Sequence, residues 1–242
     1  GLVGALEGGT VFVLCTPDVV NVLDVLCLGT LDGAEQAAKA LRDKFRGAGE
    51  PGSAVEALSQ GAPVAEATHV VRLSCEEAFF VSYAVEALAV VDWGEAGGDQ
   101  ARVLGSEDLW KRLLEARSDF PVLYLAYHHF RSKYGADFVV YHRHPAVAHS
   151  DYTSIVLPLL PPEEEARRQE GALSDKVYLR PPPEVHSIQI ASRLSAQVSK
   201  RLMLLYLRIP SAEALLSPAC LTLCQAEERL MRRWVPESHR GV

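Results

Sequence analysis

Apolar and polar positions in the first 66 residues predict one strand and two helices. Residues 10–15, TVFVLC, have the β-branched and aromatic residues of a strand. PDVVNVLDVL follows, with Pro17 near its start and apolar residues at helical spacing, which indicates a short helix. AEQAAKALRDKF predicts another helix, inside a segment, 31–66, that is rich in Gly, Ala, Glu and Ser. We interpret the end of this segment as a linker that reaches Ala67.

Three further helices are predicted between residues 74 and 133. Ser74 and Glu77 form a capping box, and the apolar positions after it predict a helix that continues through Leu88. GEAGGDQ breaks the pattern. Ser106 is the expected cap of the second helix. Asp119, followed by a proline at the favoured first-turn position, opens a third helix that ends near residue 133.

The pattern changes after residue 137. FVVY and YTSIVLPLL predict strands, and LMLLYLRI predicts a buried strand. Residues 161–176 are a charged insertion that we expect to form a surface loop. Residues 187–199 fit a helix, and Ser217 with the following proline predicts a last helix to Trp234. The chain is therefore expected to be α/β (α+β), with a mainly helical N-terminal half and a C-terminal half that alternates strands and helices.

Composition and charge argue against some classes of function. The chain has 242 residues, 48% of them hydrophobic, and a net charge of −7, which argues against a chain that grips RNA alone. No apolar run approaches the roughly 18 residues of a membrane span, and no secretory signal is visible. The five cysteines are expected to be reduced thiols. Cys220 and Cys224, one helical turn apart, fit packing residues better than half of a zinc site.

Histidines cluster between His128 and His149, and three interpretations remain open for them. His142 and His144 share a strand face and, with His149, could ligate a metal, or all three could be solvated. The third interpretation is acid/base chemistry, because Tyr141 and His149 are separated by a turn that could bring them together. With Lys200 as a cation, such a set could cleave RNA without metal. Taken alone, Lys200 fits a helix-dipole partner or a solvated residue better than a catalytic cation.

Two blocks of the sequence resemble the signatures of the tRNA-splicing endonuclease family. The first is YGADFVVYHRHPAVAHSDYTSIV, and the second is SRLSAQVSKRLMLLYL. VRLSCEEAFFVSYAVEALAV and LSPACLTLCQAEERLMRRWV resemble the catalytic subunit assigned to the 5′ splice site. The resemblance covers residues 67–236, with a fainter match near the N-terminus. It implies an N-terminal family domain at 67–118, after a variable segment 1–66, and a restriction-endonuclease-like catalytic domain with a mixed sheet at 119–242.

The resemblance also implies residue roles. The family triad falls on Tyr141 as general base, His149 as general acid and Lys200 as the cation that stabilises the transition state. Arg193 matches a substrate-binding position, and the family uses arginines to sandwich a base by cation–π contact. Members cleave intron-containing pre-tRNA to 2′,3′-cyclic phosphate and 5′-hydroxyl ends, with no metal or other cofactor. The expected partners are the two structural subunits and the other catalytic subunit of a heterotetramer, in the nucleus or, for some members, at the mitochondrial surface.

The sequence departs from the family pattern in the insertion at 161–176, in the Gly/Ala-rich linker and, with most consequence, just before Tyr134. HHFRSK runs directly into YGADF, where the family has a short segment that forms a turn and a strand. This departure keeps a second interpretation open, that of a non-catalytic scaffold subunit or an inactive isoform of the same complex. A metal-binding histidine protein is the third, and it predicts stoichiometric zinc.

Overall fold

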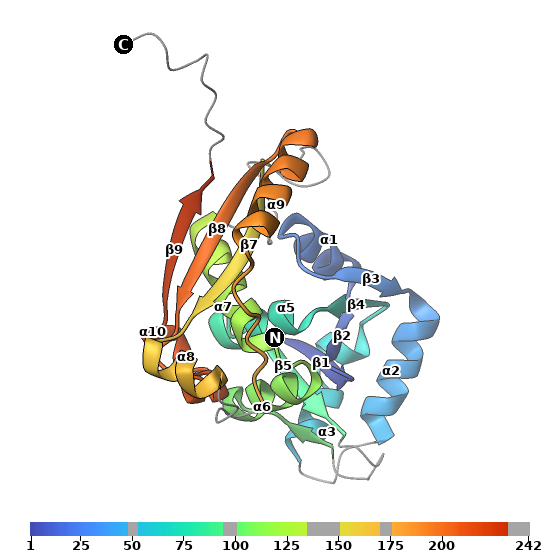
Figure 1. The fold of residues 1–242 in the computed structure, drawn as a ribbon. Helices are drawn as coiled ribbons and strands as arrows, with labels where there is room; N and C mark the ends of the chain where they lie inside the picture. The colour runs from blue at the N-terminus through green and yellow to red at the C-terminus, as the bar shows by residue number, and fades with distance from the viewer. Residues whose placement is uncertain (48–52, 94–100, 135–150, 170–175, 232–242) are drawn as a thin grey trace.

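The computed structural model describes residues 1–47, 53–93, 101–134, 151–169 and 176–231. Two sheets make up the fold, with helices both between them and on their outer faces (Figure 1). The first sheet has the order β3-β4-β2-β1-β5-β6, and the second has the order β7-β8-β9. Among the described residues, no helix is long and apolar enough to cross a membrane.

The first sheet is built from strands on both sides of the expected linker. Its members are β1 (Leu2–Glu7), β2 (Thr10–Cys15), β3 (Thr30–Gly33), β4 (His69–Leu73), β5 (Leu88–Asp92) and β6 (Arg102–Val103). β1 pairs antiparallel with β2 and parallel with β5, and β2 pairs antiparallel with β4. The domain boundary that we place at residue 66 stays a prediction, although strands before and after it share this sheet.

The two faces of the first sheet bury different cores. Side chains alternate along β2, so that Val11 and Val13 belong to the larger core and Leu14 belongs to a smaller one. The smaller core lies under α2 (Glu35–Gly47), α3 (Ala54–Ser59) and α4 (Ala62–Ala65). The larger core lies under α1 (Pro17–Val25), α5 (Cys75–Phe79), α6 (Ser106–Ala116) and α7 (Phe120–Tyr134).

Aromatic side chains fill the centre of the larger core. The ring of Phe79 lies 5.0 Å from Trp110, 4.8 Å from Tyr124 and 5.9 Å from Phe120, in edge-on contacts. The indole nitrogen of Trp110 donates a hydrogen bond to the Leu215 carbonyl at 2.9 Å. These contacts tie α5, α6, α7 and the short turn Glu213–Leu216 into one layer between the two sheets.

The second sheet lies on the opposite side of α7 from the first sheet (Figure 1). β7 (Tyr152–Leu159) pairs parallel with β8 (Arg201–Arg208), and β8 pairs antiparallel with β9 (Gln225–Leu230), so the sheet is mixed as expected. α8 (Pro162–Gln169) and α9 (Val185–Gln197) lie in the crossover between the parallel strands. Leu202 and Leu204 face α9, whereas Leu205 faces the larger core, which explains the unbroken apolar run of β8.

Several predicted elements are confirmed. The strands at 10–15, 152–159 and 201–208 and the helices near 17–25, 35–47 and 120–134 form as expected, and 187–199 corresponds to α9 with a shift of two residues. The capping box is also present, and the second oxygen of its Glu77 accepts a hydrogen bond from the Gly29 amide at 2.9 Å. Gly29 has φ +73, and a Cβ there would lie 2.6 Å from the Val71 side chain.

Other predictions are wrong. The N-terminal half is not mainly helical, because six strands form its sheet. The helix after Ser74 ends in a single π-helical turn, Phe80–Ala84, and Leu88 begins β5 instead of extending the helix. The second of the three helices is capped by Gly105, so Ser106 is its first residue. Residues 162–169 of the expected charged loop are the helix α8.

The predicted last helix is also wrong. Within the part that the structure describes, up to residue 231, only the short helix α10 (Cys220–Leu223) forms there, and residues 225–230 are the strand β9. β8 supplies the partner that favours a strand, because Met203 to Arg208 pair with Leu230 to Gln225. The carboxylate of Glu228 also accepts a hydrogen bond from, or forms an ion pair with, the His129 imidazole on α7 at 2.7 Å. This contact holds β9 against the helical layer.

Candidate active site

Lys200 lies at the junction between α9 and β8, and its backbone is held by a helix-ending motif. Val198 is the last partly helical residue of α9, and Ser199 follows with φ +57. The amide of Ser199 donates to the Ala196 carbonyl at 3.2 Å, and the amide of Lys200 donates to the Ser195 carbonyl at 2.9 Å. This pair of bonds is a Schellman motif. The chain therefore turns sharply at Ser199 and presents Lys200, half-exposed, immediately before β8.

The start of β7 lies beside this junction. The amide of Arg201 donates a hydrogen bond to the Asp151 carbonyl at 2.8 Å, and Tyr152 pairs with Arg201 in the parallel ladder. A side-chain contact reinforces the alignment, because the Thr153 and Ser195 hydroxyls are 2.6 Å apart. Ser195 is buried and also donates to the Ala191 carbonyl at 2.8 Å. The end of α9 is thus fixed to β7 as well as to β8.

Two side chains that sequence reasoning did not single out lie next to Lys200. The guanidinium of Arg201 donates to the Tyr152 hydroxyl at 2.7 Å and lies over the Tyr152 ring at 4.6 Å. Arg201 is exposed and Tyr152 is half-buried. The only signal for them was the pair of adjacent cations, Lys200 and Arg201, before an apolar run.

Arg193 is exposed on α9, two residues before Ser195. The face of α9 that packs on the sheet carries Ile188, Ala191 and Ser195, spaced by three and four residues. The apolar stripe with spacing four, Ile190, Leu194 and Val198, is exposed instead, with relative exposures of 42%, 57% and 60%. The helix prediction was therefore right, but this stripe is not its buried face.

The remaining predicted site residues, Tyr141, His142, His144 and His149, lie outside the described residues. The structure therefore does not test whether Tyr141 and His149 meet Lys200. Among the described ranges, no group of three or more His, Cys, Asp or Glu side chains is arranged to hold a metal ion. Cys220 is fully buried and Cys224 is half-buried, and both are free thiols.

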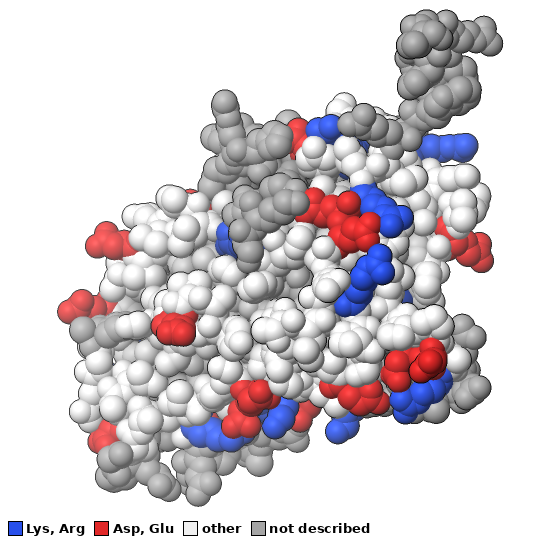
Figure 2. All heavy atoms as spheres, turned by 90° about the vertical axis from the view of Figure 1, so that its left-hand side faces the viewer, with Lys and Arg blue, Asp and Glu red and all other residues white. Residues whose placement is uncertain are grey.

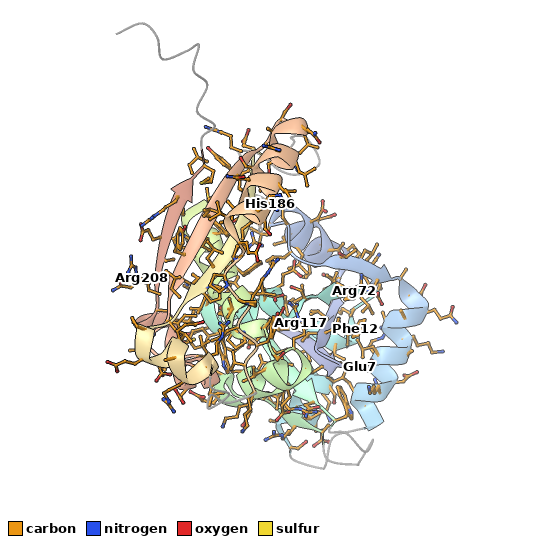
Figure 3. All side chains as sticks on the ribbon, viewed as in Figure 1. Glu7, Phe12, Arg72, Arg117, His186 and Arg208 are labelled. Carbon is orange, nitrogen blue, oxygen red and sulfur yellow. The ribbon has the colours of Figure 1, made fainter. Side chains whose placement is uncertain are left out.

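Toward the opposite end of β8, acidic and basic side chains form ion pairs with one another. Arg208, labelled in Figure 3, pairs with Glu227 at 3.0 Å, and Glu227 also pairs with Arg229 at 2.8 Å. Hydrogen bonds from these two arginines lower the pKa of the Glu227 carboxyl. Figure 2 shows this side of the molecule, where acidic and basic groups mix on a largely uncharged face. The described residues of this face do not form the continuous basic stripe that would follow a phosphate backbone.

Curated relatives of the chain carry consistent names. The chain is 33% identical over 180 residues to the tRNA-splicing endonuclease subunit Sen2-1 of Arabidopsis thaliana, a match that covers 70% of this chain and 66% of that protein. It is 34% identical over 182 residues to the tRNA-splicing endonuclease subunit Sen2 of Mus musculus, over 70% of this chain and 35% of that protein. The chain thus spans between about a third and two thirds of these relatives. No family model matches the chain.

Proposed function

Because the chain belongs to the family of tRNA-splicing endonuclease Sen2 subunits, we propose that it is the catalytic subunit that cleaves intron-containing pre-tRNA at the 5′ splice site. The products are a 2′,3′-cyclic phosphate and a 5′-hydroxyl end. The other catalytic subunit and two structural subunits are its partners in a heterotetramer. The complex works in the nucleus.

The reaction needs three roles, and the family triad gives one residue to each. Tyr141 removes the proton of the ribose 2′-hydroxyl, whose oxygen attacks the adjacent phosphorus. His149 donates a proton to the leaving 5′-oxygen. Lys200 stabilises the negative charge that builds on the phosphoryl oxygens in the transition state. Arg193 contacts a base at the cleavage site, which holds the scissile linkage in line for attack.

One observation carries the proposal in the described residues. The main-chain bond from Arg201 to Asp151 joins the residue after Lys200 to a point only two residues along the chain from His149. The Schellman motif holds the chain before Lys200, and the β7–β8 ladder holds the chain after it. A catalytic cation needs such a fixed position, because small displacements cost large factors in rate.

A second candidate, a scaffold subunit of the same complex, is favoured by the end of α7. This helix continues to Tyr134, the first residue of the Tyr-Gly-Ala-Asp motif. The family has a turn and a strand between the corresponding helix and motif. A chain without that segment could keep the fold and the subunit contacts while its catalytic segment is misplaced.

The test is cleavage by the complete heterotetramer in EDTA. Complexes with the unchanged chain, His149→Ala, Lys200→Ala and Lys39→Ala are compared, with incorporation of each variant confirmed. Lys39 is an exposed lysine on α2 and serves as the matched control. We expect 5′-site cleavage to fall by roughly 10²- to 10³-fold for Lys200→Ala, as for removal of one oxyanion donor, and to stay unchanged for Lys39→Ala.

The readout is the chemistry of the ends at each splice site. Cyclic-phosphate ends at the 5′ site with the unchanged chain, lost in His149→Ala while the 3′ site is still cut, support the catalytic assignment. If the assembled complex cuts only the 3′ site with every version of this chain, including the unchanged one, the scaffold assignment replaces it.

A further inference from the structure

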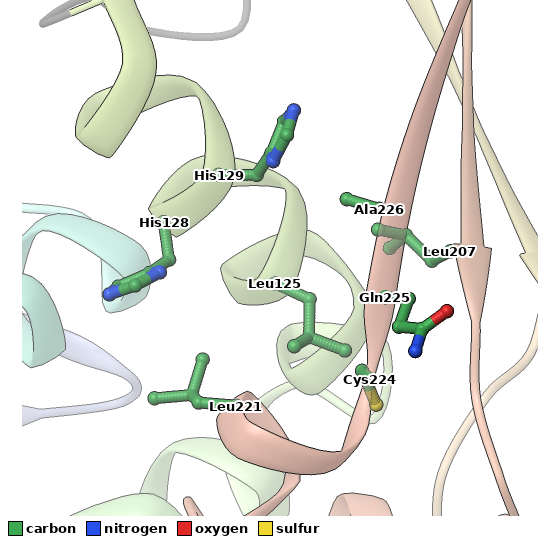
Figure 4. Close-up of a pocket in the computed structure, with 8 residues that line it drawn as sticks. All are labelled: Leu125, His128, His129, Leu207, Leu221, Cys224, Gln225 and Ala226. Carbon is green, nitrogen blue, oxygen red and sulfur yellow. The ribbon is translucent and has the colours of Figure 1, made fainter.

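A second chemical feature lies at the far end of β8 from Lys200. A pocket of about 380 Å³ opens between α7 and the start of β9, and its lining includes Leu125, His128, His129 and Cys224 (Figure 4). Leu207 also lines it, and it follows Arg201 by six residues, or about 20 Å of strand. The pocket is therefore separate from the candidate active site.

Cys224, which lines this pocket, lies one helical turn after a second thiol, Cys220. Cys220 begins the single-turn helix α10, and Cys224 ends it, with its amide donating to the Cys220 carbonyl at 2.9 Å. The thiol of Cys220 donates a hydrogen bond to the Cys224 sulfur. Residues four apart in a helix have Cα atoms about 6 Å apart, within the range that a disulfide bridges. The two sulfurs are thus already neighbours.

The two cysteines differ in exposure and in reactivity. Cys220 is fully buried, whereas Cys224 is half-buried and lines the pocket. The hydrogen bond from Cys220 lowers the pKa of the Cys224 thiol, and the same bond, with burial, raises the pKa of Cys220. Burial raises the pKa of Cys15 to about 12 and that of Cys75 to about 11, which makes both inert. Cys224 is therefore set apart from these buried cysteines as a nucleophile.

We propose that Cys224 and Cys220 are a redox-active dithiol, in which Cys224 reacts with a peroxide that enters the pocket and Cys220 resolves the product to a disulfide. The inference does not depend on the proposed function. In the first step the Cys224 thiolate attacks one peroxide oxygen, the O–O bond breaks, and the leaving hydroxide takes a proton to become water. Cys224 is now a sulfenic acid.

In the second step the Cys220 sulfur attacks the Cys224 sulfur. An S–S bond forms, the S–O bond breaks, and the hydroxyl leaves with the Cys220 proton as a second water. The two thiols have lost two electrons, and the peroxide has gained them. The disulfide closes the turn that leads directly into β9, so oxidation would fix the start of this strand.

Peptide mapping of the native full chain tests the proposal, because trypsin leaves both cysteines in one peptide, residues 209–229. The chain is exposed to hydrogen peroxide at pH 7, free thiols are blocked, and the peptides are weighed. We expect the mass of this peptide to fall by two hydrogen atoms before Cys27, the other half-buried cysteine, is oxidised, because Cys224 lines the pocket and has a resolving thiol beside it.

Two variants separate the steps. Cys220→Ser removes the resolving thiol, so Cys224 should accumulate as a sulfenic acid that a cyclic 1,3-dione traps. Cys224→Ser should leave the buried Cys220 unoxidised. Near-ultraviolet circular dichroism confirms that each variant is folded. Oxidation of Cys224 no faster than Cys27 in the unchanged chain, or a disulfide that forms only in denaturant, would overturn the proposal.

Discussion

Replacing Ser199 with glycine should stabilise the protein, although glycine usually weakens a structure. Ser199 holds φ +57 at the turn between α9 and β8, and its side chain is exposed. A residue with a Cβ pays roughly 1–2 kcal/mol for a left-handed backbone, a cost that glycine avoids. Glycine loses more conformational entropy on folding, which costs roughly 0.5–1 kcal/mol. The difference predicts a net gain of about 0.5–1 kcal/mol for Ser199→Gly.

The matched control lies two residues earlier. Gln197 is exposed in the last turn of α9, where the backbone is helical and glycine has no advantage. Gln197→Gly should therefore destabilise the protein by roughly 0.5–1 kcal/mol. Ser199→Ala keeps the left-handed cost and should stay within about 0.5 kcal/mol of the unchanged chain. Glycine is thus expected to stabilise the protein at position 199 and to destabilise it at position 197.

Urea unfolding of the full chain measures these differences. The urea concentration at the unfolding midpoint should rise for Ser199→Gly and fall for Gln197→Gly, with no change in the slope of free energy against urea concentration. In thermal unfolding, each kcal/mol should shift the melting temperature by about 2–4 °C. If Ser199→Gly is no more stable than Ser199→Ala, the left-handed turn before Lys200 is absent from the folded protein. The account of how Lys200 is positioned would then be refuted.

Three further substitutions test other contacts. Burial lowers the pKa of His128, so protonation of this residue favours the unfolded chain, and the free energy of unfolding should fall as the pH drops from about 7 to 5. His128→Phe should make that fall smaller, whereas the control His186→Phe, at an exposed histidine, should leave it unchanged. Glu228→Gln weakens the contact with His129 and should cost roughly 1 kcal/mol, seen as faster amide exchange along β9, and unchanged exchange would contradict it. Ser195→Ala should cost about 1–3 kcal/mol in urea unfolding, and a neutral result would mean that its contact with Thr153 does not anchor α9 to β7.

The strands that could be predicted are those whose residues favour a strand locally. Residues 152–159 contain the β-branched residues typical of a strand and form β7, and residues 201–208 are the unbroken apolar run of a strand buried on both faces and form β8. Residues 225–230, QAEERL, have helical propensity but form β9, because β8 offers a ladder and His129 offers a partner. Likewise, Leu88 continues a helical pattern from Ser74, but a π turn intervenes and the strand pairs with β1. Pairing between distant segments is not visible in a local window.

The candidate site shows the same division between local and long-range information. Lys200 was found through a resemblance, and the lysine alone fitted an ordinary helix-end residue. Its positioning depends on the backbone of Ser195 and Ser199 and on a bond to Asp151. These residues act through their backbone groups, so no motif of reactive side chains could reveal them. A change at Ser195 or Ser199 should therefore act on Lys200 through geometry, whereas a change at Lys200 removes the charge itself.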